Sequence, residues 1–476
     1  DFTYPFVIEL CPGQNHLIAK PPFYEEFKAS GKFSLCGYRM FENAQVTSAS
    51  ASTSELLPFW QYRRLIASEN FPASSFANDI AMINWESNDL RGQNIIDQPP
   101  QTVAKRLALG KALSLGFLYW LQTEAPRDDG GTGYPEFKLR ADLTGSPDGL
   151  AKFPYIRESR RLKAQRTIVE KDIVVSNNAN ARAKSCHDSV GIGHYPVDIH
   201  GQQDIPGAGQ STRPFQIPAS ALVQNQIANF LPACKNIGTT HVSNGAFRLH
   251  PIEWAIGESA ASLAVYSLKH KRAPWRLLRN RKILRQVQNN LVKEGAPLVW
   301  FDDLPPEDNA FAAGQYLAIT GIMPPEKNSL AFRPTAWLSK REAAAALDRL
   351  LRLDKLGAGG KEKQEPKLTG SALAAPDTVQ ISPKSGADKE STSSPAADLA
   401  SSGAMSRCIN AGLLRADSAG NFQAEAPMSP LDLVFLNSHR LINIAATVPA
   451  SDQVTRGEFA LWLYQIAQSP RFFGRH

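Results

Sequence analysis

The chain has 476 residues, of which 43% are hydrophobic and 20% are charged, so it is long enough for two or three domains with sizeable cores. The 52 Lys and Arg exceed the 45 Asp and Glu only mildly, and no apolar run reaches the ~18 residues of a membrane span. The densest basic cluster, residues 269–285, has apolar residues at helical spacing, which favours a solvated helix face over a nucleic-acid surface. The five cysteines are scattered without a C-x-x-C pair, which argues against a disulfide framework and a zinc ribbon.

The first part of the chain is expected to mix short strands with one long helix. Two β-like runs, Tyr4–Leu10 and Phe33–Phe41, stand among loops rich in Ser and Ala. Residues Pro100–Thr123 predict a long helix, because leucines recur there in a broad apolar band. A charged loop with glycine breakers follows, and residues 133–225 are expected to form short strands and turns.

The segment from residue 229 to 268 predicts a strand, a polar loop and a helix. Phe230–Ile237 is expected as a buried strand, and Pro251 is expected to open the helix. Small residues inside that helix, among them Gly257, let it approach another backbone closely. A helix N-terminus carries unpaired N–H groups and a positive dipole end, which suits the electron-rich pyrimidine end of a reduced flavin.

After Trp300 the composition changes to that of a helical region. A helix is predicted over 310–322. Two further helical segments are predicted, Leu338–Leu347 and Val454–Leu463, and the second residue of each is a Ser or Thr with a Glu three residues later. That spacing is a capping box, which marks a helix start. Residues 354–402 are rich in Gly, Lys, Ala, Ser and Pro, so they are predicted to be a disordered linker.

Residues 188–200 contain the densest group of reactive side chains. Asp198 and His200 would share one face of a strand. Beside a flavin, this pair could remove a substrate proton while the ring accepts hydride. Two alternatives stay open: a structural polar cluster in which His200 caps a loop, and a metal-dependent hydrolase that uses Zn²⁺ or Mn²⁺. The potential metal ligands are His187, Asp188, His194, Asp198, His200, His241 and His250.

Several motifs together resemble a known family. They are Arg157–Arg161, Asp188–Gly193, Asp198–His200 and Gly238–His241 continuing through Glu258. In this order they resemble the C-terminal part of the bacterial FAD-dependent oxidoreductase family, over about residues 60–268. The resemblance implies a mixed α/β (α+β) fold of the FAD/NAD(P)-binding type in residues 1–300, with FAD as cofactor. It also implies two-electron oxidation, by hydride transfer, of a small organic, for example sugar-like, substrate, with the electron acceptor unknown.

The resemblance also implies roles for single residues. An arginine near the flavin could orient a carboxylate or stabilise the anionic reduced ring, although an ion pair with Glu158 is the structural alternative. The residues expected in catalysis are Arg157, Arg160, Tyr195, Asp198 and His200. Those expected to bind the cofactor are Lys235, Asn236, Gly238, His241, Arg248, His250, Pro251, Ile252 and Gly257.

Two further expectations concern the ends of the chain. Such a flavoprotein should open with a strand, a G-x-G-x-x-G turn and a helix that hold the ADP half of FAD, and no such motif occurs here. Since the first residue is Asp1, the chain is predicted to start within a longer flavoprotein. Residues 306–353 and, in degenerate form, 403–470 resemble S-layer homology repeats. That resemblance implies binding to a cell-wall polymer and export to the periplasm or cell envelope, and it leaves a non-catalytic envelope protein as an alternative.

Overall fold

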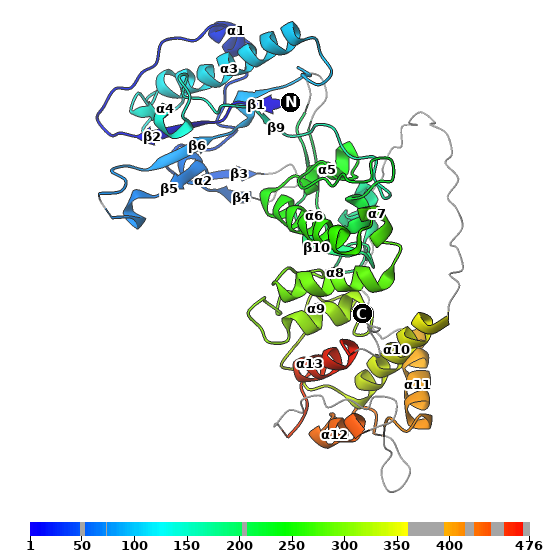
Figure 1. The fold of residues 1–476 in the computed structure, drawn as a ribbon. Helices are drawn as coiled ribbons and strands as arrows, with labels where there is room; N and C mark the ends of the chain where they lie inside the picture. The colour runs from blue at the N-terminus through cyan, green and yellow to red at the C-terminus, as the bar shows by residue number, and fades with distance from the viewer. Residues whose placement is uncertain are drawn as a thin grey trace. The chain divides into compact units, whose positions relative to one another are not determined.

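The computed structural model describes residues 1–47, 53–72, 74–201, 207–359, 395–414, 423–438 and 452–469. The chain divides into two compact units (Figure 1). Unit 1 consists of residues 1–160 and 198–209, and unit 2 consists of residues 161–197 and 210–476. Both units mix helices with small sheets, in agreement with the predicted α/β class.

Unit 1 is built on an antiparallel sheet in the order β5-β6-β2-β8, packed against helix α3. The predicted strand near the N-terminus is present as β2 (Phe6–Leu10), and the predicted long helix is α3 (Pro100–Thr123). Phe6 and Ile8 alternate along β2 and are fully buried, as are Phe117 and Leu121 of α3, so these two elements share one core. The other strands of this sheet are β5 (Arg64–Ile66), β6 (Ile80–Ile83) and β8 (Phe137–Leu139).

A second sheet of unit 1, in the order β7-β1-β9, carries the polar network analysed below. Its strands are β1 (Phe2–Thr3), β7 (Asp89–Leu90) and β9 (Tyr155–Ile156). Helix α3 approaches this sheet closely, because a Cβ at Gly110 would lie 2.7 Å from the ring of Phe2. The remaining elements are α1 (Tyr24–Ala29), β3 (Ala44–Thr47), β4 (Thr53–Leu56), α2 (Phe59–Arg63), α4 (Ala141–Thr144) and the 3-10 turns η1 (Ser68–Asn70) and η2 (Glu86–Asn88).

The strand predicted over Phe33–Phe41 is wrong. The chain turns there, with positive φ values of 54° at Cys36 and 86° at Gly37, and these values are incompatible with an extended strand. Phe33 and Leu35 are still buried, because they pack into the core from a loop. Their apolar side chains produced the strand-like pattern without strand geometry.

The sheet of unit 2 is a pair of antiparallel strands covered by a helix. Strands β10 (Ser189–Gly193) and β13 (Phe215–Pro218) are antiparallel, and α6 (His250–His270) packs on β10. The double glycine of β10 serves this packing: a Cβ at Gly193 would lie 2.5 Å from the Phe215 ring and 2.9 Å from the Ile252 side chain. The 3-10 turns of unit 2 are η3 (Glu170–Asp172), η4 (Val175–Asn177) and η5 (Ala219–Ala221). Strands β11 (Val197–Ile199) and β12 (Ala208–Gln210) pair with each other and belong almost wholly to unit 1.

The strand predicted over Phe230–Ile237 is also wrong, whereas the helix start at Pro251 is confirmed. Residues 230–237 form no strand, since Pro232 cannot donate a ladder hydrogen bond and Phe230 is exposed. The expected polar loop contains the short helix α5 (His241–Phe247), capped by Thr240. Helix α6 begins at His250 with Pro251 in its first turn, as the sequence predicts.

The C-terminal half of unit 2 is helical. The predicted helices appear as α9 (Phe311–Ile319), α10 (Lys340–Gly359) and α13 (Arg456–Ala467), and Gly321 ends the first of them with φ 76°. Both ends of the predicted linker are helical, because α10 continues to Gly359 and α11 (Pro395–Asn410) begins inside it; residues 360–394 lie outside the described residues. The other helices are α7 (Pro274–Leu277), α8 (Arg281–Lys293) and α12 (Pro430–Ser438). None of the described helices combines the length and apolar character needed to cross a membrane.

Three helix starts of this region meet through their backbones. The N–H of Leu338 donates to Val454 O at 3.0 Å, that of Val454 donates to Met428 O at 3.0 Å, and that of Met428 donates to Leu338 O at 2.8 Å. The residue after each of these three caps the helix that follows. The cap pairs are Ser339 with Glu342, Ser429 with Asp432, and Thr455 with Glu458. The capping-box pattern in the sequence predicted the first and the last of these three helix starts, but not the middle one.

Candidate active site: a histidine between carboxylates

The register of the β7-β1-β9 sheet aligns the buried part of the site in unit 1. Thr3 pairs with Asp89 on one side, and Phe2 pairs with Ile156 on the other, which places Arg157 just beyond the end of β9. The Asp89 side chain is fully buried. Thr3 donates its hydroxyl to Asp89 Oδ1, and Arg157 Nη1 donates to the same oxygen at 2.6 Å.

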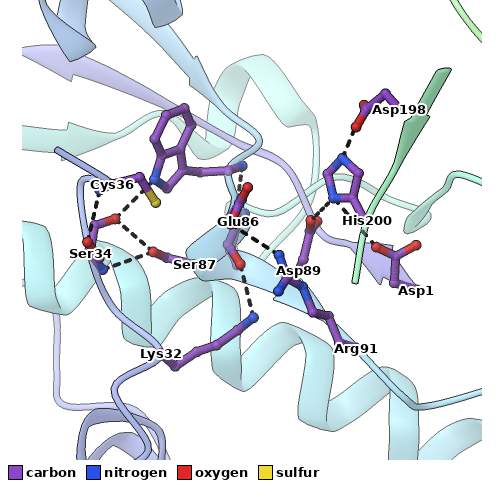
Figure 2. A network of polar contacts seen from close by, with 12 residues as sticks. Asp1, Lys32, Ser34, Cys36, Glu86, Ser87, Asp89, Arg91, Asp198 and His200 are labelled. Atoms are coloured by element: carbon purple, nitrogen blue, oxygen red, sulfur yellow. Dashed lines mark hydrogen bonds and ion pairs between the residues drawn. The ribbon is translucent and has the colours of Figure 1, made fainter. Parts of the chain in front are cut away.

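His200 completes the network from the loop after β11 (Figure 2). Its Nδ1 lies 2.8 Å from Asp89 Oδ2 and 3.7 Å from Asp1 Oδ2, and its Nε2 lies 3.4 Å from Asp198 Oδ2. The His200 side chain is 17% exposed and that of Asp198 is 42% exposed, so the buried contact is on Nδ1 and the open one is on Nε2. The structure thus brings together Arg157, Asp198 and His200 of the predicted catalytic set.

The charges of this network shift the ionisation of its members. Burial acts to raise the pKa of Asp89, but the hydrogen bond from His200, the charge of Arg157 and the Thr3 hydroxyl together hold it below its ordinary value. Burial acts to lower the pKa of His200, but its contacts with Asp198 and Asp89 outweigh burial and raise it. Asp89 therefore stays ionised to lower pH than a free aspartate does, and His200 binds a proton more readily than a free histidine does.

A small cavity gives access to the open side of His200. It has a volume of about 260 Å³ and is lined by His200, Asp198, Glu86, Arg91 and the backbone around Gly207. Gly207 is required there, because a Cβ would lie 2.7 Å from Ile199 O. A polar substrate group that enters this cavity can reach the imidazole edge without displacing buried residues.

Sequence reasoning missed the neighbours of His200 that come from the first ninety residues. Asp89 belongs to a run of consecutive buried polar residues, Ser87–Asp89, which has no apolar periodicity. Lys32 donates to Glu86 O at 3.0 Å, and Arg91 pairs with Glu86 at 3.2 Å (Figure 2). Burial, helped by the charge of Arg91, lowers the pKa of Lys32 to about 8. In the sequence this side of the site shows only a short polar run, Glu86–Asp89, which is also typical of an exposed turn.

Two members of the predicted catalytic set do not join the network. Arg160 is exposed and pairs with Asp97 on the surface of unit 1. It therefore forms a surface ion pair and does not contact the buried network. Tyr195 belongs to unit 2, where its carbonyl accepts a hydrogen bond from Thr212 Oγ1 at 2.8 Å.

The predicted cofactor-binding residues form one continuous surface segment of unit 2 around α5 and the start of α6. His241, His250 and Pro251 are exposed at the two helix starts, whereas Arg248 and Ile252 are buried. Lys235 Nζ lies 3.8 Å from Glu253 Oε1, and Asn236 O accepts a hydrogen bond from Leu162 N at 2.9 Å.

The two glycines of that set differ in their surroundings. A Cβ at Gly238 would lie 2.5 Å from both Ala164 Cβ and Arg166 O, so protein packing alone requires a glycine there. A Cβ at Gly257 would lie 3.4 Å from Ala233 O, which is an ordinary contact. The exposed residues nevertheless fit one end of a flavin: the positive end of the 21-residue helix α6, with His250 exposed on it, offers donors to pyrimidine carbonyls.

A metal site receives limited geometric support. Within the described part of the chain, the group of His, Cys, Asp and Glu close enough to share an ion is Asp1, Asp89 and His200. His200 is the one member of the seven predicted ligands in this group. Arg157 already lies 2.6 Å from Asp89 and 3.8 Å from Asp1, so a cation occupies the position that an ion would need.

Comparison with known proteins gives one positive result. The family model described as FAD dependent oxidoreductase matches residues 28–291. This range contains the whole of the predicted resemblance, the α5–α6 segment, and Asp89, Arg157, Asp198 and His200 of the network, but not Asp1 or Thr3. No curated protein and no solved structure matches the chain. Because the family match spans more than half of the 476 residues, the chain belongs to the FAD-dependent oxidoreductase family, and it is an enzyme with FAD as its cofactor.

Proposed function

We propose that this oxidoreductase removes two electrons from a small hydroxylated, for example sugar-like, substrate, with His200 as its acid–base group. The observation that carries the proposal is the imidazole held at 2.8 Å by the buried Asp89 carboxylate, with its other nitrogen facing a polar cavity. Bound FAD supplies the two-electron acceptor of such a reaction.

The proposed roles of the neighbouring residues follow from their contacts with His200. Asp89 accepts from Nδ1 and so fixes the tautomer that leaves Nε2 unprotonated, which is the same logic as that of a carboxylate behind a catalytic histidine. Nε2 then accepts the proton of a substrate hydroxyl in the cavity. Asp198, at 3.4 Å and partly exposed, stabilises the imidazolium that results. Arg157 and Thr3 act indirectly, because they hold Asp89 in place.

Flavin contacts are assigned to unit 2 within the same proposal. The exposed residues His241, His250 and Pro251, with Lys235 and Asn236 beside them, would hold the flavin through the helix start of α6. Gly238, Ile252 and Arg248 would support the shape of this segment from within, and Gly257 would let the flavin approach α6.

Anaerobic reduction of the FAD-loaded enzyme tests the proposal. Loss of the flavin's visible absorbance would be followed with a panel of polyols and sugars, first for the native enzyme and then for His200→Ala. The rate of reduction should fall by ~10²–10⁴-fold in the variant, the range for a positioned acid–base group, while FAD content stays the same. Normal reduction by His200→Ala would refute the role of His200, and an absence of reduction by every hydroxylated compound would refute the substrate class.

A second proposal concerns the helical region of unit 2. The closed set of three backbone hydrogen bonds at Leu338, Met428 and Val454, each next to a capped helix, supports the resemblance to S-layer homology repeats. We propose that residues 306–353 and 403–470 bind a cell-wall polymer and that the protein is exported to the periplasm or cell envelope. Sedimentation of the intact protein with purified wall sacculi tests this, and equal recovery in the supernatant with and without sacculi would refute it.

A further inference from the structure

Unit 2 contains a cavity that neither the His200 network nor the α5–α6 segment uses. Its volume of about 480 Å³ lies within the ~300–1,000 Å³ range of small-molecule pockets. Its wall combines residues of β13, α8 and α9 with the loops around residues 182–187 and 320–325.

The charges in the wall of this cavity all have one sign. Arg182 and Arg285 line it, and the described lining residues include no Asp or Glu. Asp302 and Asp303 act on Arg182, and Asp188 acts on Arg285, from beyond the cavity wall. Burial outweighs these charges and lowers the pKa of both guanidinium groups, that of Arg182 to about 10. Two partly desolvated cations therefore face one cavity whose described lining holds no carboxylate, an arrangement that a bound anion would stabilise.

The two arginines differ in how many of their N–H groups already donate hydrogen bonds within the protein. Arg182 uses Nε, Nη1 and Nη2 to bind the carbonyls of Trp300, Glu326, Ser329 and Leu330 at 2.6–3.1 Å, so it is fixed and contributes its field. Arg285 donates only through Nη1, to Gln288 Oε1 at 2.6 Å, Ile319 O at 3.2 Å and His187 O at 3.5 Å. Within the described residues its Nε and Nη2 have no hydrogen-bond acceptor, and these two donors form the planar edge that binds a carboxylate in bidentate fashion.

The rest of the wall indicates what the anion is attached to. Trp300, Pro324 and Pro325 present apolar surface to the same space. Inorganic ions would leave these surfaces in contact with water, whereas an organic acid would cover them. We propose that this cavity binds a small organic carboxylate, with Arg285 pairing the carboxylate and Trp300 and the two prolines contacting its apolar body.

A purely structural role for Arg285 predicts a different result. Its contact with Ile319 O satisfies the end of α9, which one cation can do without any ligand. That role accounts for Nη1, but it does not account for Nε and Nη2 of Arg285 or for the cavity that this side chain lines. Direct binding measurements therefore separate the two explanations.

The experiment is calorimetric titration of the purified, FAD-free protein with benzoate, with benzamide as the neutral probe of the same shape and inorganic phosphate as the non-organic anion. Benzoate should bind at least ~10-fold more tightly than benzamide, since a charge-assisted hydrogen bond is worth more than a neutral one. Arg285→Gln should weaken benzoate binding by ~10–100-fold. Lys282→Gln is the matched control, because Lys282 is exposed on the same helix and lies outside the cavity wall, and it should bind benzoate as the native protein does.

A second variant keeps the test decisive if Arg285→Gln does not fold. Ser185 is an exposed residue at the cavity, so Ser185→Phe should block it without disturbing the core, and should abolish benzoate binding. The proposal is overturned if benzoate gives no binding heat at millimolar concentration, if phosphate binds more tightly than benzoate, or if Ser185→Phe binds benzoate normally. Because the readout is binding to the FAD-free chain, the result is independent of the flavin chemistry proposed above.

Discussion

Removing the charge of Asp89 should loosen the whole β7-β1-β9 sheet. Asp89→Asn keeps the shape of the side chain but takes the counter-ion from Arg157, whose side chain is only 7% exposed, and from His200. Breaking a buried ion pair by neutralising one partner costs ~3–5 kcal/mol, because the other charge stays buried without compensation. The Thr3 hydroxyl bond adds little to this loss, since an amide oxygen can still accept it.

Hydrogen–deuterium exchange of the peptides that contain β1, β7 and β9 measures this loss locally. A cost of ~3–5 kcal/mol corresponds to exchange that is faster by roughly a hundred-fold to several thousand-fold. Asp97→Asn is the matched control, because Asp97 pairs with Arg160 on the surface with 78% of its side chain exposed, and it should leave the exchange of these peptides unchanged. A change of less than ~1 kcal/mol in Asp89→Asn would refute the reasoning, since it would mean that Arg157 finds another acceptor, for example Asp1 at 3.8 Å.

Three further measurements test other parts of the structure. The pKa of His200 is raised in the folded protein, so protonated His200 stabilises the fold fully below pH 6.5, and this stabilisation is lost as the pH rises through the folded-state pKa. An NMR titration of His200 should give a midpoint above 6.5, and Asp198→Asn should lower that midpoint. A midpoint at or below 6.5 in the native protein would contradict the network. Gly193→Ala should destabilise unit 2 by ~1–3 kcal/mol in urea unfolding, because the added Cβ meets Phe215 at 2.5 Å, whereas Gly321→Ala has open space around it and should cost only the strain of its positive φ. His250→Ala should lower FAD retention through gel filtration without changing the far-UV circular dichroism, and full retention would remove His250 from the flavin contacts.

Helix signals in the sequence were accurate where they depend on neighbouring residues. Helix α3 has the bounds that its apolar band predicts, and the Thr455–Glu458 capping box forms with both reciprocal hydrogen bonds. Pro251 opens α6 for the same reason: its fixed φ and missing N–H suit a first helical turn. In each case the information lies in a continuous stretch of sequence, four residues long for the cap and a whole helix long for α3.

Strand assignments failed where an apolar run was interrupted by local geometry. The run at 230–237 contains Pro232, and the run at 33–41 contains the positive-φ residues Cys36 and Gly37. Apolar side chains there serve the core from loops, as the burial of Leu35 and Ile237 shows. Apolar character therefore predicted burial at these positions, while the backbone conformation depended on one or two residues within each run.

The His200 site shows a second kind of limit, because half of it comes from distant sequence. Asp198 could be paired with His200 from their spacing alone, and the 3.4 Å contact agrees with that pairing. Asp89 is 111 residues away and is brought to Nδ1 only by the register of three short strands, which no local pattern encodes. In the proposed mechanism this distant half matters, because the buried Asp89, itself anchored by Arg157, takes up Nδ1 and leaves Nε2 for the substrate. Under that proposal, substitution of Asp89 or Arg157 should alter catalysis even though neither lines the cavity.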